Sequence, residues 1–222
     1  MSTRQLSGPG TALLRALRRP AEPTVRPEHC ALCGVGLSGV HRHLADTAER
    51  SLACACPPCA LLFQRPGAAG GRYRPVPNRL LYDPGGAPGP DVWARLRIPV
   101  STAFLLHNAD RAQPVLCYPS PAGATESELS PATYDAVFGA NRLAAALEPD
   151  VEALLLRRSK GGSGPERIQC FLVPVDLCYE LVGRMRRTWQ GFDGGAEAHA
   201  ELDAFFAAVD ERARPLNEEL SP

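Results

Sequence analysis

The feature that most constrains this chain is a block of five cysteines between positions 30 and 59. Four of them form two Cys-x-x-Cys pairs, and the fifth, Cys54, lies two residues before the second pair. A Cys-x-x-Cys turn lets two sulfurs converge on one ion, and two such turns complete a tetrahedron. The pairs therefore predict one metal site with the ligands Cys30, Cys33, Cys56 and Cys59.

The segment between the two pairs predicts a β-hairpin. Residues 41–44 and 50–55 are expected to pair as strands around a turn at 46–47. Twenty-two residues separate Cys33 from Cys56, slightly more than the roughly 15–20 of the simplest ribbons, and a longer hairpin would absorb the difference. This arrangement is zinc-ribbon-like. Four thiolates would close the coordination sphere, which is typical of structural sites.

Three further side chains add ligand candidates to the block: His41, His43 and Cys54. Residues 41 and 43 project from one face of their strand, as do residues 54 and 56 from theirs, so all could crowd one end of the hairpin. Three alternatives are open: Cys54 replaces Cys56 as a ligand, a second ion binds to this group, or the histidines are simply solvated. Zinc is the expected metal. The alternative metal is iron in a rubredoxin-like site. The first pair ends in Cys-Gly and the second begins with Cys-Pro, which resembles the cysteine turns of rubredoxin.

Composition divides the chain into five parts. We expect a tail over residues 1–27 with a short amphipathic helix, a zinc-ribbon-like metal module over 28–65, a Pro/Gly-rich bridge over 66–90, an α+β domain over 91–214 and a second tail over 215–222. The bridge is either a flexible linker or a covering loop pinned by its tyrosines.

Local patterns in the 91–214 domain predict strands followed by helices. We expect an extended segment over 92–107 and strands at 114–118, 151–156 and 168–175, the last two joined by a turn at 160–164. The expected helices are one from Ser130-Pro131 that resumes over 141–147, one capped by Asp176, and a last one over 196–212. The predicted fold class is α+β, a small ribbon-like hairpin module followed by a mixed domain with C-terminal helices. Three isolated cysteines in apolar contexts, Cys117, Cys170 and Cys178, are expected as buried hydrophobic side chains.

Charge and hydropathy disfavour several classes of protein. The 24 basic and 24 acidic side chains give no net charge, so no overall field draws in nucleic acid. No stretch approaches the roughly 18 apolar residues of a membrane span, and the first residues lack a secretory pattern. We therefore expect a cytoplasmic protein without a membrane span, and thiolates rather than disulfides.

Standard catalytic signatures are missing from the sequence: it has no nucleophile elbow, phosphate loop, dinucleotide fingerprint or His-Glu-x-x-His pair. The polar segment Thr125–Glu128, which we interpret as a turn, offers Glu126 as a candidate acid or base. An enzyme is therefore the less favoured class.

Several separated sequence motifs resemble those of a known family. They are the two cysteine motifs Cys30-x-x-Cys33 and Cys54-x-Cys56-x-x-Cys59, and the segments Tyr118–Ser127, Pro149–Leu155 and Leu172–Tyr179. Together they resemble an uncharacterised actinobacterial family that is encoded beside nickel–iron hydrogenase genes. The resemblance implies hydrogenase subunits or maturation factors as partners, and it supplies no reaction.

The sequence and this resemblance together predict a non-catalytic metal-binding accessory protein that acts through protein–protein contacts. One alternative is a rubredoxin-like iron protein that transfers electrons in a hydrogenase system. A second alternative is an enzyme with a site near Glu126.

Overall fold

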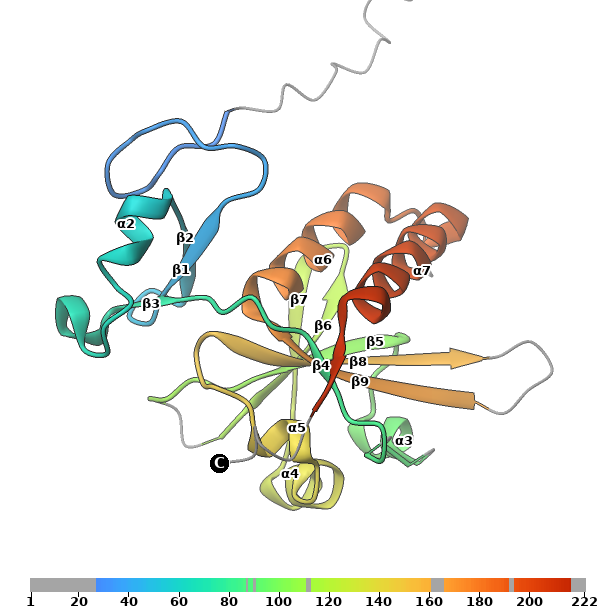
Figure 1. Ribbon diagram of the computed structural model, residues 1–222. Helices are drawn as coiled ribbons and strands as arrows, with labels where there is room; N and C mark the ends of the chain where they lie inside the picture. The colour runs from blue at the N-terminus through green and yellow to red at the C-terminus, as the bar shows by residue number, and fades with distance from the viewer. Residues whose placement is uncertain are drawn as a thin grey trace, which may run out of the picture.

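Two β-sheets organise the chain, one in a small N-terminal module and one in a larger body (Figure 1). The computed structural model describes residues 27–86, 88–89, 91–110, 113–160, 166–191 and 194–216. The amphipathic helix expected near the N-terminus, most of the turn expected at 160–164 and most of the C-terminal tail lie outside the described residues. The architecture is mixed α+β with C-terminal helices, as predicted.

The small module, residues 28–76, is a three-stranded sheet with the strand order β2-β1-β3. Strands β1 (Arg42–Asp46) and β2 (Ser51–Ala55) are antiparallel, which confirms the predicted hairpin. The third strand, β3 (Tyr73–Pro75), pairs with β1 and comes from the segment expected as a bridge. We call this unit the ribbon module.

A short helix, α2 (Pro57–Leu61), follows the hairpin where the sequence indicated only a turn. Proline at the first helical position fits this helix start, because its fixed φ suits the helix and its missing N–H costs nothing there. The hydrophobic core of the ribbon module has only three fully buried members, Leu44, Ala55 and Ala60. So small an apolar core points to a second source of stability for the module.

The body contains a seven-stranded sheet with the order β10-β4-β9-β8-β5-β6-β7. All neighbours are antiparallel except β10 and β4. The strands are β4 (Leu81–Tyr82), β5 (Thr102–Leu106), β6 (Val115–Ser120), β7 (Gly123–Ser127), β8 (Glu152–Lys160), β9 (Glu166–Pro174) and β10 (Arg214–Pro215). The central halves of β8 and β9, residues 153–156 and 170–173, are apolar on both faces, as expected where helices cover both sides of a sheet.

Helices cover the two faces of the body sheet in separate groups (Figure 1). Helices α6 (Val175–Thr188) and α7 (Gly195–Arg212) pack on one face through a stripe that includes Leu181 and Phe206. The other face carries the short helices α3 (Val92–Leu96), α4 (Pro131–Phe138) and α5 (Arg142–Ala145). A 3₁₀ turn, η1 (Ala68–Gly71), precedes β3.

The extended segment predicted over 92–107 is wrong at its start, where the chain forms helix α3. Val92, Trp93 and Leu96 are all buried, at the spacing of one helical face. Arg97 then takes a left-handed conformation with φ 53°, which ends the helix before β5.

Two further sequence predictions are corrected by the structure. The segment containing Glu126 is not a turn but edge strand β7, which pairs with β6 after a tight connection closed by Gly123 at φ 126°. Asp176 does not cap α6, because the cap position is Pro174 and Asp176 lies in the first turn. Its carboxylate faces the ribbon module instead, where it accepts a hydrogen bond from His43.

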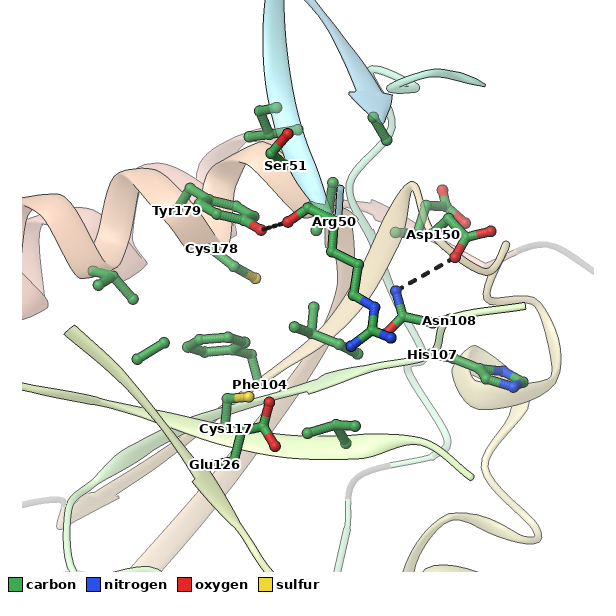
Figure 2. A pocket seen from close by; sticks show the side chains of 18 of the residues that line it. Arg50, Ser51, Phe104, His107, Asn108, Cys117, Glu126, Asp150, Cys178 and Tyr179 are labelled. Atoms are coloured by element: carbon green, nitrogen blue, oxygen red, sulfur yellow. Dashed lines mark hydrogen bonds between the residues drawn. The ribbon is translucent and has the colours of Figure 1, made fainter. Parts of the chain in front are cut away.

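The ribbon module docks on the body through polar contacts at two places. On α6, Asp176 accepts from His43 Nδ1 at 2.8 Å. The Tyr179 hydroxyl of the same helix donates to the Arg50 carbonyl at 3.2 Å (Figure 2). From β3, Arg74 donates to the Pro149 carbonyl at 2.6 Å and forms ion pairs with two carboxylates of the same loop. These contacts fix the module against the end of the sheet.

Next to this junction, a buried carboxylate generates the first testable prediction. Glu152 is fully buried, and Arg79 donates to its two oxygens at 2.6 and 2.8 Å. We expect Arg79→Ala to lower the free energy of unfolding by about 3 kcal/mol, because it leaves a buried charge without its partner. Arg95→Ala, which removes an exposed pair with Asp91 one helical turn away, is the matched control and should have little effect. Urea unfolding measures both, and equal losses would contradict the assignment.

Candidate metal centre

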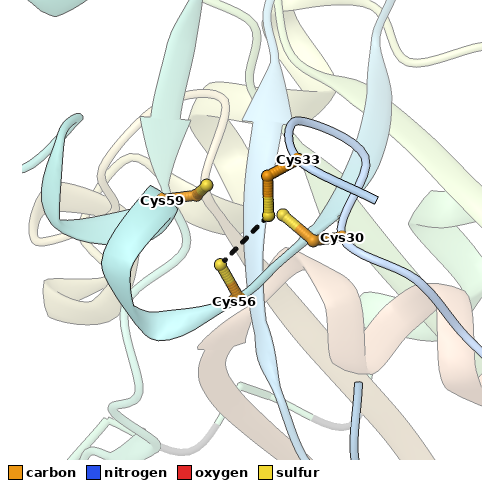
Figure 3. A group of neighbouring side chains, drawn as sticks. All are labelled: Cys30, Cys33, Cys56 and Cys59. Atoms are coloured by element: carbon orange, nitrogen blue, oxygen red, sulfur yellow. Dashed lines mark hydrogen bonds between the residues drawn. The ribbon is translucent and has the colours of Figure 1, made fainter. Parts of the chain in front are cut away.

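Four cysteines converge in the ribbon module (Figure 3). The sulfur atoms of Cys30, Cys33, Cys56 and Cys59 all lie within 4.8 Å of one another, and those of Cys33 and Cys56 are 3.7 Å apart. A tetrahedron with Zn–S bonds of about 2.3 Å has an edge of about 3.8 Å. All four are free thiols, so the donor set fits one tetrahedral ion of a thiophilic metal.

Backbone hydrogen bonds shape the first Cys-x-x-Cys turn. The Gly34 amide donates to the Cys30 carbonyl at 2.9 Å, and the Cys30 amide donates to the Val35 carbonyl at 2.8 Å. Gly34 closes this turn at φ 75°, a left-handed conformation that favours glycine. The Ala31 amide then donates to the Cys54 carbonyl at 2.8 Å, which ties the turn to β2.

The second turn is the start of helix α2. Cys56 is its N-cap residue, and its carbonyl accepts from the Ala60 amide at 2.9 Å. The helical backbone then carries Cys59 round to the same side as Cys56 (Figure 3). Both pairs are therefore held in position by local backbone structure, so that a metal would find its ligands already grouped.

The electrostatics of the four thiols are uneven. A hydrogen bond from the backbone amide of Cys56 lowers the pKa of Cys30 to about 6. For Cys33 the backbone amide of Val35 acts in the same direction, but side-chain bonds with Cys30 and Cys56 outweigh it and raise the pKa. The side-chain bond with Cys56, and then burial, raise the pKa of Cys59 to about 12. The raised pKa values favour the protonated thiols of Cys33 and Cys59, and a bound cation would displace these protons.

A second group of ligand atoms lies beside the first. The ring nitrogens of His41 and His43 and the sulfur of Cys54 fall within 4.8 Å of one another. His43 on β1 is directly opposite Cys54 on β2, which explains their approach. The sequence singled out all seven of these side chains, and the structure sorts them into a group of four cysteines and a group of two histidines and one cysteine.

The remaining described cysteines are buried in the body, as predicted. Burial raises the pKa of the Cys170 thiol to about 12, and burial raises that of Cys178 further still. Cys117 is buried on β6. Thiols of this kind are poor nucleophiles at neutral pH.

A cavity of about 370 Å³ lies between the ribbon module and the body (Figure 2). Its walls come from the β1–β2 turn, the ends of β5 to β7, and α6, and they include Arg50, His107, Glu126 and Tyr179. Three of its four lining carboxylates are paired with arginines elsewhere: Asp46 with Arg72, Asp150 with Arg74, and Glu152 with Arg79. Glu126 lies on the exposed edge strand, on the wall opposite Arg50.

Sequence reasoning missed two of the residues that shape these sites. Asp176 was assigned to a helix cap, although its carboxylate orients His43. Arg50 had no role assigned, yet it lines the cavity with φ 50° at the β1–β2 turn. No local pattern identifies either residue, because both roles depend on contact between segments that are far apart in the chain.

The fold and the site define the class of protein: a mixed α+β protein with a four-cysteine candidate metal centre in a small N-terminal module. The chain belongs to a family of unknown function, DUF5947, whose model matches residues 29–213. It has no significant match among curated proteins or among solved structures. Within the described residues, no helix has both the length and the apolar character needed to cross a membrane.

The geometry of the four cysteines generates the second prediction. Protein washed with a mild chelator should retain about one tightly held metal ion per chain, because four thiolates surround it. Cys59→Ser should remove most of that metal and loosen the ribbon module, since one ligand of four is lost. Cys170→Ala, in the core on the far face of the body sheet, is the control and should keep the metal. Elemental analysis decides, and full retention in Cys59→Ser would reject the ligand set.

Proposed function

We propose that this protein is a non-catalytic, cytoplasmic metal-binding accessory protein that supports the assembly or function of nickel–iron hydrogenases through protein contacts. The hydrogenase setting comes from the sequence resemblance to a family encoded beside those genes. The observation that carries the contact role is the distribution of exposed apolar side chains, which gather on the ribbon module.

Of the seven large apolar or aromatic side chains exposed in the described part of the chain, five belong to the ribbon module. They are Leu32, Val35, Val40, Leu61 and Leu62. Val40 is 92% exposed and Leu62 is 70% exposed. Leu32, Val35, Leu61 and Leu62 lie within three residues of a cysteine of the metal centre. Apolar side chains grouped in this way are typical of a surface that binds another protein.

The metal in this proposal is zinc, with a structural role. Four thiolates leave no position for water or substrate, and such closed sites act as folding staples. The alternative is iron on the same cysteines, as in a rubredoxin-like electron-transfer protein. Zinc gives colourless protein, whereas iron gives thiolate charge-transfer bands in the visible spectrum and a reversible one-electron couple.

The docking role is tested by changing the apolar surface without touching the metal. We expect Leu61→Ser combined with Leu62→Ser to weaken co-purification with hydrogenase subunits or maturation factors from the native host at least about tenfold, because central apolar contacts carry much of the binding energy of an interface. The metal content should not change. Tyr82→Ser, which alters an exposed aromatic residue of the body, is the control. Equal recovery with both variants would refute this surface, and loss of metal from the double variant would show a folding defect.

The cavity at the junction supports a second candidate function, the binding or conversion of a small molecule near Glu126. Its volume of about 370 Å³ lies in the range of about 300–1,000 Å³ that is usual for ligand pockets. Its lining combines apolar side chains with the charged groups of Arg50, Glu126 and Arg186. A zwitterion would match these charges, with its cationic group at Glu126 and its anionic group at the arginines.

This second function predicts a ligand-dependent gain in stability. A ligand at about 100 times its dissociation constant adds about 2.7 kcal/mol, which corresponds to a rise in Tm of about 5 °C or more for a chain of this size. A thermal-shift screen of small amino acids, which are zwitterions at neutral pH, measures it. Glu126→Gln should abolish the rise for any compound found, whereas Glu128→Gln, two residues along and outside the cavity lining, should preserve it. An identical response in both variants would remove Glu126 from the site.

A further inference from the structure

His41 is a buried side chain with an unsatisfied polar atom. Its side chain is only 5% exposed, and its Nε2 has no hydrogen-bond partner. Buried polar atoms are almost always hydrogen-bonded, so an exception calls for an explanation such as an ion. His41 and His43 lie with ring centroids 4.7 Å apart, and a ring nitrogen of each is within 4.8 Å of the other and of the Cys54 sulfur.

Both imidazoles are oriented through the same nitrogen. His41 Nδ1 lies 2.9 Å from the Ser38 carbonyl oxygen, and His43 Nδ1 lies 2.8 Å from Asp176 Oδ2. Since a carbonyl and a carboxylate can only accept, each Nδ1 carries the proton and donates it. The protons on Nδ1 leave the Nε2 lone pairs free for a metal. Imidazoles that bind metals are commonly held in this way, with the second nitrogen donating to a carbonyl or a carboxylate.

From these contacts we propose that His41, His43 and Cys54 form a second metal site, separate from the four-cysteine centre, for a divalent transition-metal ion. Two Nε2 atoms and one thiolate sulfur are the protein ligands. Three ligands leave a tetrahedral ion one open position, whereas the four-cysteine centre is closed. The site goes beyond the proposed docking function, which rests on Leu61 and Leu62, so that either can fail without the other.

The donor set selects the class of ion. Imidazole nitrogen and thiolate sulfur favour Zn²⁺, Co²⁺ and Ni²⁺ over Mg²⁺ and Ca²⁺, which prefer oxygen. With one position open, the bound ion can accept an external ligand or pass to another protein. The expected affinity is lower than that of the four-cysteine centre because one ligand fewer holds the ion.

Asp176 is a positioning residue for this site. It comes from α6 of the body, whereas all three ligands belong to the ribbon module. Loss of such a carboxylate partner typically lowers metal affinity by about 10–100-fold while the ligands remain in place. Metal binding at this site therefore depends on the contact between module and body.

Cobalt uptake tests the site directly. Protein that holds zinc in its four-cysteine centre, with loosely bound metal removed, is titrated with Co²⁺ without oxygen. We expect about one cobalt ion per chain to bind without release of zinc, with a thiolate-to-cobalt charge-transfer band and the strong visible absorption of tetrahedral cobalt. His41→Gln and Cys54→Ser should each weaken binding at least about 100-fold, and Cys54→Ser should also abolish the charge-transfer band.

Two variants complete the test. Asp176→Asn keeps every ligand and should weaken cobalt binding about 10–100-fold, so it carries the test if His41→Gln fails to fold. His199→Gln changes an exposed histidine of α7 and should leave the titration unchanged. The proposal is overturned if no cobalt binds beyond the zinc, if cobalt uptake is matched by zinc release, or if His41→Gln and Cys54→Ser bind cobalt as tightly as the unaltered protein.

Discussion

The convergence of four thiols is the constraint on which the ribbon module depends. Sulfurs within 4.8 Å of one another cannot all carry negative charge unless a cation lies among them. The ribbon module also has too small an apolar core to hold its three strands together by burial alone. Structural zinc contributes about 10–16 kcal/mol to the folding of small domains, whereas one buried leucine contributes about 2 kcal/mol. A metal held by the four cysteines would therefore supply much of the stability of the ribbon module.

The contacts between module and body make the second ligand group more than a by-product of the hairpin. His43 on β1 lies opposite Cys54 on β2, and His41 comes just before β1, so the hairpin brings both rings near Cys54 whatever lies behind it. What orients His43 is a carboxylate supplied by a helix more than a hundred residues away in the sequence. The ribbon module alone supplies the ligands and orients His41 through Ser38, but only the assembled protein orients His43.

The elements that could be predicted from sequence were those with a local cause. The cysteine spacing, the hairpin between the pairs, the Ser130 cap and the apolar strands β8 and β9 all follow from neighbouring residues. The failures had non-local causes. Strand β3 lies in a Pro/Gly-rich segment whose pairing depends on β1, and β7 is a polar edge strand that only β6 stabilises. Asp176 looked like a cap because its partner, His43, is known only once the ribbon module packs against α6.

The position of the cavity couples the ribbon module to the body. Its walls include the β1–β2 turn on one side and strands and α6 of the body on the other, so that a molecule bound there would touch both units. Such a molecule would favour the docked arrangement, and so would a metal held by His43 under the control of Asp176. Thermodynamic linkage makes this relation reciprocal. A molecule in the cavity would raise the affinity of the protein for the metal by the same factor by which the metal raises its affinity for that molecule.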